Sequence, residues 1–579
     1  VWVDHSNGFN TVIIASEVAE SFAPAHKTWL RGCIVKESES VIAFGSESFV
    51  KAGIQTGKSL LSATGEFICL SWNAEQVLAQ RDFFTSVSLS WTTANGVFAV
   101  SDSILILASL RIALGSTNSF DSEIAMARSP FSSISEQQME NRTLIKEIHY
   151  VPAAQGIRFS FSERTAQLFG EKIAQSDLVE SSEYSDDYST EIRKSALWVA
   201  NVVKGLHEQT DIPLSLSLSG GYDSRVVLTG FSAAGILHES TIVSRGEGRG
   251  DPRDFDAVTK LVKDHGVPVQ FSTAPPESAS ESSTSPLLVW ASTLLGAYDR
   301  FSPSQVRPND HKSKIALTGM GAEILKGNWN FRSWKQICSD TPIAPMYEKY
   351  FAEAGKRGIA DLGAPLDQSD TSEWYYIGYR NGIHATGGHI ANHMTAVTPL
   401  HQRRFVAMAH KSQTRLHGFP EKPELRIADL NILLDSKIAA ADYDRPERNL
   451  NKQFVQERIE FLGGVIRSEE IDAVRVYGAP INSPGGSSTF SLNIAESFGL
   501  NIEPHGEAVM DFVNKNLSAI SSDYSSKSVE KIHTAATKHL IEEKRNVFSN
   551  TSAAGKLVNF IALSRASSEI KRSFSFFRR

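Results

Sequence analysis

The sequence predicts an α/β protein: a β-rich N-terminal part, then a doubly wound parallel sheet with a helical C-terminal extension. Three observations support this class. Short apolar runs separated by turn residues recur through residues 1–170. Strand-like and helix-like segments then alternate from residue 213 onward, and the last third of the chain has mostly helical patterns. Such alternation is typical of parallel sheets, because parallel neighbours need a crossover connection.

In the N-terminal part, the expected strands are short apolar runs bounded by turn residues such as Gly65 and Asn95. These runs lie at residues 11–14, 66–70, 96–100 and 157–161. One helix is expected at Ser103–Leu114, where apolar residues recur at roughly helical spacing. We therefore expect mainly strands before residue 170.

The second part begins with an amphipathic helix expected at residues 189–207. Strands are expected at 213–218, 240–244, 267–271 and 315–318, with helices at 223–234 and 255–265 between them. A polar stretch rich in Ser and acidic residues lies near 175–190, as is typical of a linker. We therefore predict two domains, 1–178 and 190–579.

Composition narrows the class of protein. Lys and Arg number 58 against 65 Asp and Glu, so the net charge is 58 − 65 = −7 and no basic excess points to a nucleic-acid partner. The three cysteines, Cys33, Cys69 and Cys338, are odd in number and far apart, which argues against a disulfide framework or a zinc site. No apolar run is long enough to span a membrane and no secretory signal is seen, so a cytoplasmic protein is expected.

The most informative segment is a glycine loop between an apolar strand and a helix, reading Ser-Leu-Ser-Gly-Gly-Tyr-Asp-Ser from Ser217. Glycines let the backbone approach a ligand closely, and a helix N-terminus offers unpaired N–H groups to phosphate. The Asp would repel phosphate unless a cation such as Mg²⁺ lies between them. We expect phosphate binding by Ser217, Ser219, Gly220, Gly221, Tyr222, Asp223 and Ser224. The alternative, a glycine turn with an Asp as helix cap, is weaker in this context.

This loop resembles the pyrophosphatase loop of enzymes that cleave ATP to AMP and pyrophosphate. Among them the chain is similar to the asparagine synthetase family, which includes β-lactam synthetases, carbapenam synthetases and lasso-peptide macrolactam cyclases. The resemblance covers most of the chain, and the loop is its most specific part. It implies an Ntn-amidotransferase-like sandwich domain before an ATP-pyrophosphatase domain, with ATP and Mg²⁺ as cofactors. It also allows a homodimer.

A second glycine segment, Gly319-Met320-Gly321-Ala322-Glu323, follows the last expected strand. It resembles the family segment whose acid helps to hold Mg²⁺, which implies that Asp223 and Glu323 are the metal ligands and that Gly319 lines the nucleotide site. Met320 departs from the family, because methionine cannot act as a general base. The alternative is a glycine turn with a Glu near the start of a helix.

The remaining nucleotide contacts are inferred from the resemblance. Residues near Val243 and Ser244 are expected to meet the adenine. Asp254 is equally well explained as a helix cap and receives no catalytic role. The family uses a C-terminal lysine to neutralise charge on pyrophosphate. Lys452 is the candidate here and Lys437 the second choice, with a solvent-exposed lysine as the alternative for each.

Histidines gather near the segment Val397–Arg403, which roughly resembles a family segment that ends in an acid. His401 or Gln402 stands where that acid is usual, and Thr395 replaces another. His384, His389 and His393 could serve as a base or as ligands. Because the chain has 16 histidines, chance clustering is the simpler interpretation.

The N-terminal part resembles the amidohydrolase domain of glutamine-dependent asparagine synthetase at Gly65–Ile68, Arg81-Asp82 and Gly96–Asp102. That domain depends on a nucleophilic N-terminal Cys whose own amine is the base. Here position 1 is Val1, and Cys33 lies inside the chain without a free amine. We therefore expect a degenerate domain without glutaminase activity, unless a Cys precedes Val1.

Together these features predict an ATP-dependent carbon–nitrogen ligase that adenylates a carboxylate and transfers the acyl group to an amine. The expected partners are a small-molecule or peptide carboxylate and an amine. Both a macrolactam, as in lasso-peptide cyclases, and an intermolecular amide stay open. A glutamine-dependent asparagine synthetase and a non-catalytic nucleotide-binding module are the alternatives.

Overall fold

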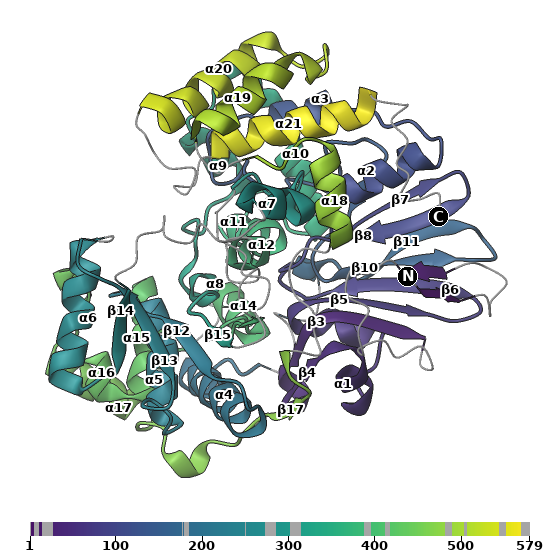
Figure 1. Ribbon diagram of the computed structural model, residues 1–579. Coiled ribbons are helices and arrows are strands. Elements are labelled where there is room, and N and C mark those ends of the chain that lie inside the picture. Colours follow the sequence, from purple (N-terminus) through teal and green to yellow (C-terminus); the bar gives the residue numbers. More distant parts are fainter. Residues whose placement is uncertain are drawn as a thin grey trace.

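The computed structural model shows a mixed α/β protein (Figure 1). It describes residues 2–4, 11–13, 27–175, 178, 184–248, 251–272, 285–300, 314–386, 395–411, 417–480, 489–502, 506–542 and 552–568. His389, His393 and the serine-rich stretch at 275–284 lie outside the described residues. In the described part, no helix is both long and apolar enough to cross a membrane.

The N-terminal part is built on a seven-stranded mixed sheet of order β11-β10-β6-β5-β3-β4-β17. Its strands are β3 (Thr28–Lys36), β4 (Val41–Phe44), β5 (Thr64–Trp72), β6 (Gln76–Arg81), β10 (Gln155–Ser160), β11 (Thr165–Gly170) and β17 (Arg475–Tyr477). A three-stranded sheet contains β7 (Ser90–Ala94), β8 (Val97–Ser101) and β9 (His149–Tyr150), and β1 (Trp2–Asp4) pairs with β2 (Thr11–Ile13). The prediction of a β-rich part is confirmed, as is the expected helix, α2 (Ile104–Ala113), whereas two short helices, α1 (Gly45–Lys51) and α3 (Ser122–Arg128), were not predicted.

The C-terminal part contains a five-stranded sheet in which every pair is parallel. Its order is β14-β13-β12-β15-β16, with β12 at Leu214–Ser217, β13 at Thr241–Arg245, β14 at Val269–Ser272, β15 at Ile315–Leu317 and β16 at Thr395–Val397. β12 is the central strand. β13 and β14 extend the sheet on one side of it, and β15 and β16 extend the sheet on the other. The strand order therefore reverses between β12 and β15, and ligands of such sheets bind beyond the carboxyl ends of the strands at this point.

Three helices follow the predicted pattern and support this sheet: α4 (Tyr188–Gln209), α5 (Tyr222–Ala233) and α6 (Pro252–His265). The Asp187 side chain caps α4 by accepting a hydrogen bond from the backbone N–H of Thr190. Helix α6 begins with Pro252 after the N-cap Asp251 and ends at Gly266, whose φ of 65° is the left-handed conformation that suits glycine.

The other helices lie around the two sheets (Figure 1). They are α1 (Gly45–Lys51), α3 (Ser122–Arg128), α7 (Pro286–Leu294), α8 (Ala322–Lys326), α9 (Trp334–Asp340), α10 (Pro345–Leu362), α11 (Thr371–Tyr376), α12 (Gly382–Thr386), α14 (Arg403–Lys411), α15 (Pro423–Leu434), α16 (Ser436–Ala439), α17 (Lys452–Phe461), α18 (Thr489–Ser497), α19 (Gly506–Asn516), α20 (Ser526–Thr537) and α21 (Ser552–Ser568). A π-helix, η7 (Ile377–Asn381), joins α11 to α12.

The two parts of the chain are joined by shared structure. Strand β17 comes from the C-terminal part but pairs in parallel with β4 of the N-terminal sheet. A buried ionic group also connects them, because Asp299 contacts Arg128 of α3 at 2.6 Å and Lys556 of α21 at 2.8 Å. Buried charges are tolerated only when they are paired and hydrogen-bonded. The C-terminal helices therefore pack as part of one structure with the N-terminal part.

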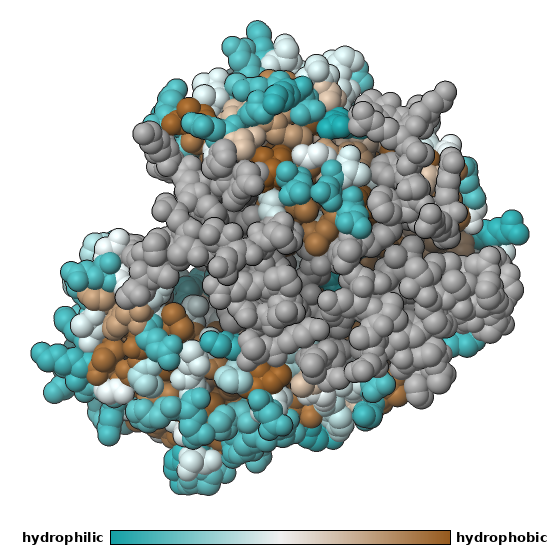
Figure 2. Space-filling model, in the orientation of Figure 1, coloured by the Kyte–Doolittle hydropathy of each residue, from teal (hydrophilic) through white to brown (hydrophobic). Residues whose placement is uncertain are grey.

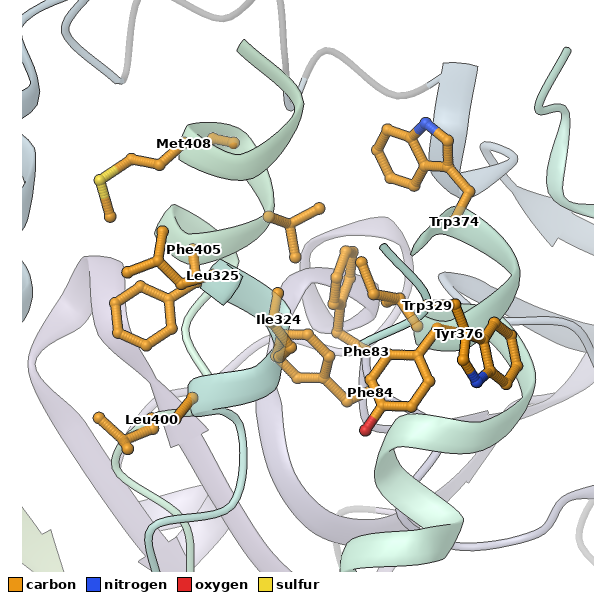
Figure 3. Close-up of a cluster of buried hydrophobic side chains, with 14 of the residues drawn as sticks. Phe83, Phe84, Ile324, Leu325, Trp329, Trp374, Tyr376, Leu400, Phe405 and Met408 are labelled. Carbon is orange, nitrogen blue, oxygen red and sulfur yellow. The ribbon is translucent and has the colours of Figure 1, made fainter. Parts of the chain in front are cut away.

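A hydrophobic cluster also crosses this boundary (Figure 3). Phe83 and Phe84 of the N-terminal part pack with Ile324 of α8 and Tyr376 of α11. Large apolar side chains that stay exposed in the described residues are scattered along the chain, for example Phe131 and Phe461. On the face seen in Figure 2, hydrophilic residues cover much of the outer rim of the part that carries α6, α16 and α17.

His401 gives a test of this packing. It is buried, its ring stacks on Phe84 with centroids 4.8 Å apart, and burial lowers its pKa to about 3. The unfolded chain takes up a proton below about pH 6.5, whereas the folded chain keeps the ring neutral until about pH 3. Stability should therefore fall as the pH drops through this window, by about 2 kcal/mol at pH 5 from this group.

Thermal unfolding of wild type, His401→Leu and His265→Gln at about pH 7.5 and about pH 5 checks this expectation. The acid-induced loss should be smaller in His401→Leu. It should be unchanged in His265→Gln, since His265 is exposed. Equal losses in all three proteins would contradict a neutral buried His401.

Candidate active site

The glycine loop lies where the strand order reverses. β12 ends at Ser217 and α5 begins at Tyr222, with Gly221 as its N-cap. The first N–H groups of a helix have no intrahelical acceptor. Gly221, Tyr222 and Asp223 line a cavity, so the start of α5 meets open space that can receive an anion.

Two other amides of the loop are already hydrogen-bonded by side chains. The N–H of Ser219 donates to Oγ of Ser224 at 3.1 Å, and the N–H of Gly220 donates to Oδ1 of Asp254 at 2.8 Å. Asp254 therefore holds the loop in shape, while Asp251 caps α6. Of the predicted phosphate ligands, the amides of Gly221, Tyr222 and Asp223 remain best placed to meet a ligand, together with the Ser219 hydroxyl.

The loop borders two neighbouring cavities. The first, here called the acidic cavity, has a volume of about 470 Å³. It is lined by Ser219, Gly221, Tyr222, Asp223, Asp254, Glu323, Lys326, Gly327, Asn328, Asn330, Pro423, Glu424, Asp444 and Arg448. Five carboxylates and two cationic side chains line it, so it is suited to bind cations together with polar ligands.

The second cavity, here called the strand-end cavity, has a volume of about 400 Å³ and lies at the carboxyl ends of β12, β13 and β14. It is lined by Ser217, Leu218, Ser219, Val243, Ser244, Arg245, Gly246, Gly248, Asp251, Pro252, Asp254, Phe255 and Ser272. Ser219 and Asp254 line both cavities, so the two adjoin at the glycine loop. The structure thus brings Val243, Ser244 and Ser217 together beside the loop.

Asp223 and Glu323, the predicted metal ligands, lie in the first turns of α5 and α8, the helices that follow β12 and β15, and line the same cavity. Both carboxylate oxygens of Asp223 contact Nζ of Lys326, at 2.8 and 2.7 Å. No group of three or more metal-binding side chains occurs among the described residues. Mg²⁺ commonly uses only one or two carboxylates together with phosphates and water. The hard oxygen donors of this pair therefore fit Mg²⁺.

Glu323 is held in place by three hydrogen bonds. Its carboxylate accepts from the N–H of Gly321 at 2.9 Å, from the hydroxyl of Tyr376 at 3.1 Å and from Nδ2 of Asn381 at 2.9 Å. Burial, and to a lesser degree the charge of Asp223, raise the pKa of Glu323 above its ordinary value. Since Tyr376 and Asn381 fix the carboxylate, a bound cation would meet it in a set orientation.

The N-terminal part of the chain supports the π-helix that carries Asn381. The π-helix that carries Asn381 is followed by Gly382, whose N–H donates to the carbonyl of Phe84 at 3.1 Å. Arg380 donates to Oε1 of Gln137 at 2.8 Å. The orientation of Glu323 therefore depends on contacts that reach into the β-rich part.

Gly319, predicted to line the nucleotide site, lines neither cavity in the described structure. A Cβ atom there would lie 2.4 Å from the carbonyl of Asp223 and 2.6 Å from the backbone nitrogen of Ser224. Gly319 therefore lets the loop after β15 approach the first turn of α5, which brings Asp223 and Glu323 to the same cavity.

A segment before α17 covers the glycine loop. The backbone N–H of Asp444 donates to the carbonyl of Gly220 at 3.0 Å, and the guanidinium of Arg225 lies 3.7 Å above the ring of Tyr443. Arg448 follows in this segment, and its Nη1 contacts Asp444 at 2.8 Å. This arrangement brings Arg448 to the wall of the acidic cavity.

Lys452 and Lys437, the predicted catalytic cations, are placed differently. Both are exposed, and neither lines a cavity in the described structure. The cations that line the acidic cavity are Arg448 and Lys326. Lys452 lies at the start of α17, four residues after Arg448. The predicted segment therefore reaches the acidic cavity through Arg448 and not through Lys452.

The described histidines do not line either cavity. His384 is hydrogen-bonded to the hydroxyl of Tyr298 at 2.6 Å, and His401 is buried against Phe84. Gln402 donates to the carbonyl of Pro399 at 3.0 Å, and Thr395 begins β16. These residues have structural contacts rather than positions at the site.

Cys33 is not placed to act as a nucleophile in the described structure. It lies buried on β3 opposite Glu66 of β5. Burial raises the pKa of its thiol and the pKa of Glu66, the latter to about 7. Because the thiolate is the reactive form, this environment disfavours reactivity.

Sequence reasoning missed Lys326, Arg448, Asp444, Tyr376 and Asn381 as site residues. Lys326 had a local signal, because it follows Glu323 by three residues and so lies one turn further along the same short helix. Tyr376 and Asn381 had none, since more than 50 residues separate them from Glu323.

Gly319→Ala tests the close approach of the loop after β15 to the first turn of α5. The added methyl should force them apart, lowering the free energy of unfolding by about 1–3 kcal/mol. Gly221→Ala is the matched control, because its Cβ would meet only ordinary contacts at 3.7 Å or more and its φ is −86°. Urea denaturation measures both variants, and equal stability would contradict the proposed packing role.

No family model matches this sequence, and no curated protein matches it either.

Proposed function

We propose that this protein is an ATP- and Mg²⁺-dependent carbon–nitrogen ligase that adenylates a carboxylate and transfers the acyl group to an amine. One observation carries the proposal. The glycine loop at the start of α5 lies between two adjoining cavities, and carboxylates from the ends of β12 and β15 share one of them. This combination suits a nucleoside triphosphate with a divalent cation.

The two cavities suggest how the nucleotide would be held. The strand-end cavity, with Val243 and Ser244, would take the nucleoside, as the resemblance to ATP-pyrophosphatase loops implies. The first amides of α5 and the Ser219 hydroxyl would bind phosphate oxygens. Arg448, whose Nη1 would lie 3.7 Å from a Cβ atom at Gly221, would add positive charge beside the loop.

Asp223 and Glu323 are the residues that would hold Mg²⁺, and Tyr376 with Asn381 would orient Glu323. When bound, the cation would neutralise charge that develops on the leaving pyrophosphate. Asp254 would keep the glycine loop in its binding conformation through the Gly220 amide.

The proposed reaction has two steps. A carboxylate oxygen of the substrate attacks the α-phosphorus and pyrophosphate leaves, and an amine then attacks the acyl carbon and AMP leaves. The chain's residues bind, orient and neutralise charge during the first step. Met320 cannot accept the proton that the amine loses, so another group must do so. The acyl donor is a small-molecule or peptide carboxylate, and the product is an intramolecular lactam or an intermolecular amide.

The same proposal assigns a family to each of the two parts of the chain. The parallel sheet with its glycine loop supports an ATP-pyrophosphatase domain of the asparagine synthetase type. The antiparallel strands before it support a degenerate amidotransferase-like domain.

Asp223→Asn tests the assigned site. Incubation with ATP, Mg²⁺ and candidate carboxylates, followed by measurement of pyrophosphate release, should show a loss of roughly 100-fold or more, because charge stabilisation at the phosphates is lost. Asp367→Asn, at an exposed position, should match wild type. Undiminished release in Asp223→Asn would refute the site. ATP binding without AMP formation for any carboxylate would indicate a non-catalytic nucleotide-binding module.

Tyr376→Phe tests the orientation of Glu323. Removing the hydroxyl should raise the Mg²⁺ concentration for half-maximal pyrophosphate release by roughly 10-fold, as for other groups that orient metal ligands. Tyr379→Phe is the matched control, since Tyr379 is equally buried but its hydroxyl meets Asp361 and Gly358 instead. The same Mg²⁺ dependence in both variants would rule out this role for Tyr376.

A further inference from the structure

Lys326 lies directly against one of the two predicted metal ligands. It is the last residue of α8, one turn after Glu323, and its ammonium lies within 2.8 Å of both oxygens of Asp223. Its side chain is 24% exposed and that of Asp223 is 39% exposed, so the pair lies open to the acidic cavity. The ammonium of Lys326 thus contacts the Asp223 carboxylate, which is one of the two proposed Mg²⁺ ligands.

Two cations cannot both take this position. A divalent ion bound to Asp223 would face the Lys326 ammonium at short distance, where like charges repel strongly. The ammonium also attracts Glu323, which adds to its hold on the site. Binding of a divalent ion therefore requires Lys326 to leave Asp223.

The cavity offers the ammonium a second set of partners. Ser219 and Gly221 of the glycine loop line the same space, so bound phosphate would lie within it. Arg448, the other cation of the wall, is already held by both oxygens of Asp444. Lysine carries its charge on a flexible four-carbon stem, which allows it to exchange one anionic partner for another.

We propose that Lys326 is an exchangeable counter-ion of this site. It neutralises Asp223 in the absence of a divalent cation, and it moves to the β- and γ-phosphates of the nucleotide when the cation binds. This inference rests on the proposed function and deepens it, because it assigns to Lys326 the phosphate-neutralising role that the sequence suggested for Lys452.

The fold does not depend on this ion pair. Ile324 and Leu325 anchor α8 in the hydrophobic cluster, and partly exposed ion pairs contribute little to stability. Lys326→Met should therefore fold, which circular dichroism and thermal unfolding can verify. Differences in ligand binding between wild type and Lys326→Met then report the loss of the Lys326 charge and not a change of fold.

The first experiment measures binding of Mn²⁺ alone, without nucleotide, by electron paramagnetic resonance of the free ion. Lys326→Met should bind Mn²⁺ roughly tenfold more tightly than wild type, because the competing ammonium is gone. Lys356→Met is the matched control, because it removes a lysine that contacts Glu353 at 2.8 Å on the exposed side of α10. It should match wild type. Unchanged or weaker Mn²⁺ binding by Lys326→Met would overturn the proposal.

A double-mutant cycle separates competition at Asp223 from a general effect of charge. In an Asp223→Asn background, the gain from Lys326→Met should disappear. A gain that persists undiminished would mean that Lys326 acts only through the overall field, which contradicts the exchange.

The second experiment measures calorimetric binding of inorganic triphosphate with Mg²⁺. Lys326→Met should bind it roughly tenfold more weakly, because one cation for the phosphates is lost. Equal affinity in wild type and Lys326→Met would overturn the transfer to phosphate. Neither experiment needs a carboxylate substrate. If both give the expected result while no carboxylate supports pyrophosphate release, the ligase proposal fails and the Lys326 exchange stands.

Discussion

The close approach of the two segments that follow β12 and β15, the first turn of α5 and the loop before α8, is the constraint on which the candidate site depends. These strands are parallel neighbours, with Leu214 opposite Ile315 and Leu216 opposite Leu317, so their following loops leave the same edge of the sheet. Gly319 permits backbone contact between the loop before α8 and the first turn of α5. As a consequence, two carboxylates that are 100 residues apart in the chain, Asp223 and Glu323, share one cavity.

The rest of the structure holds this arrangement in place from several sides. Arg225, on the buried face of α5, donates to the carbonyls of Ala441 and Asp442 at 2.8 and 2.7 Å and thereby ties the covering segment to the helix. The hydroxyl of Tyr222 donates to the carbonyl of Arg448. A single helix thus presents its first amides to the acidic cavity and also anchors the segment that brings Arg448 to the wall of that cavity.

The β-rich part contributes to the site without lining it. Phe83 and Phe84 pack against α8, and the backbone of Phe84 receives the N–H of Gly382 next to the π-helix. π-helices are rare and are frequently found at functional sites. Here the π-helix carries Asn381 to Glu323 and Arg380 to Gln137. The N-terminal part therefore has a structural role at the site that does not require any chemistry of its own.

The sequence by itself determined the local elements: the apolar strands, the capped helices α4 and α6, and the glycine loop that opens α5. Each depends on residues close together in the chain, through alternation, helical spacing or backbone conformation. It also indicated the two carboxylates, because each follows a strand within a short glycine segment.

Only the tertiary structure decided which cations reach those carboxylates, that Asp254 shapes the loop, and that Tyr376 and Asn381 hold Glu323. It placed Lys452 in solvent and Arg448 at the cavity wall, although four residues separate them. Such choices depend on the direction in which each side chain leaves its element and on the packing of distant segments. No local pattern of residues encodes either of these.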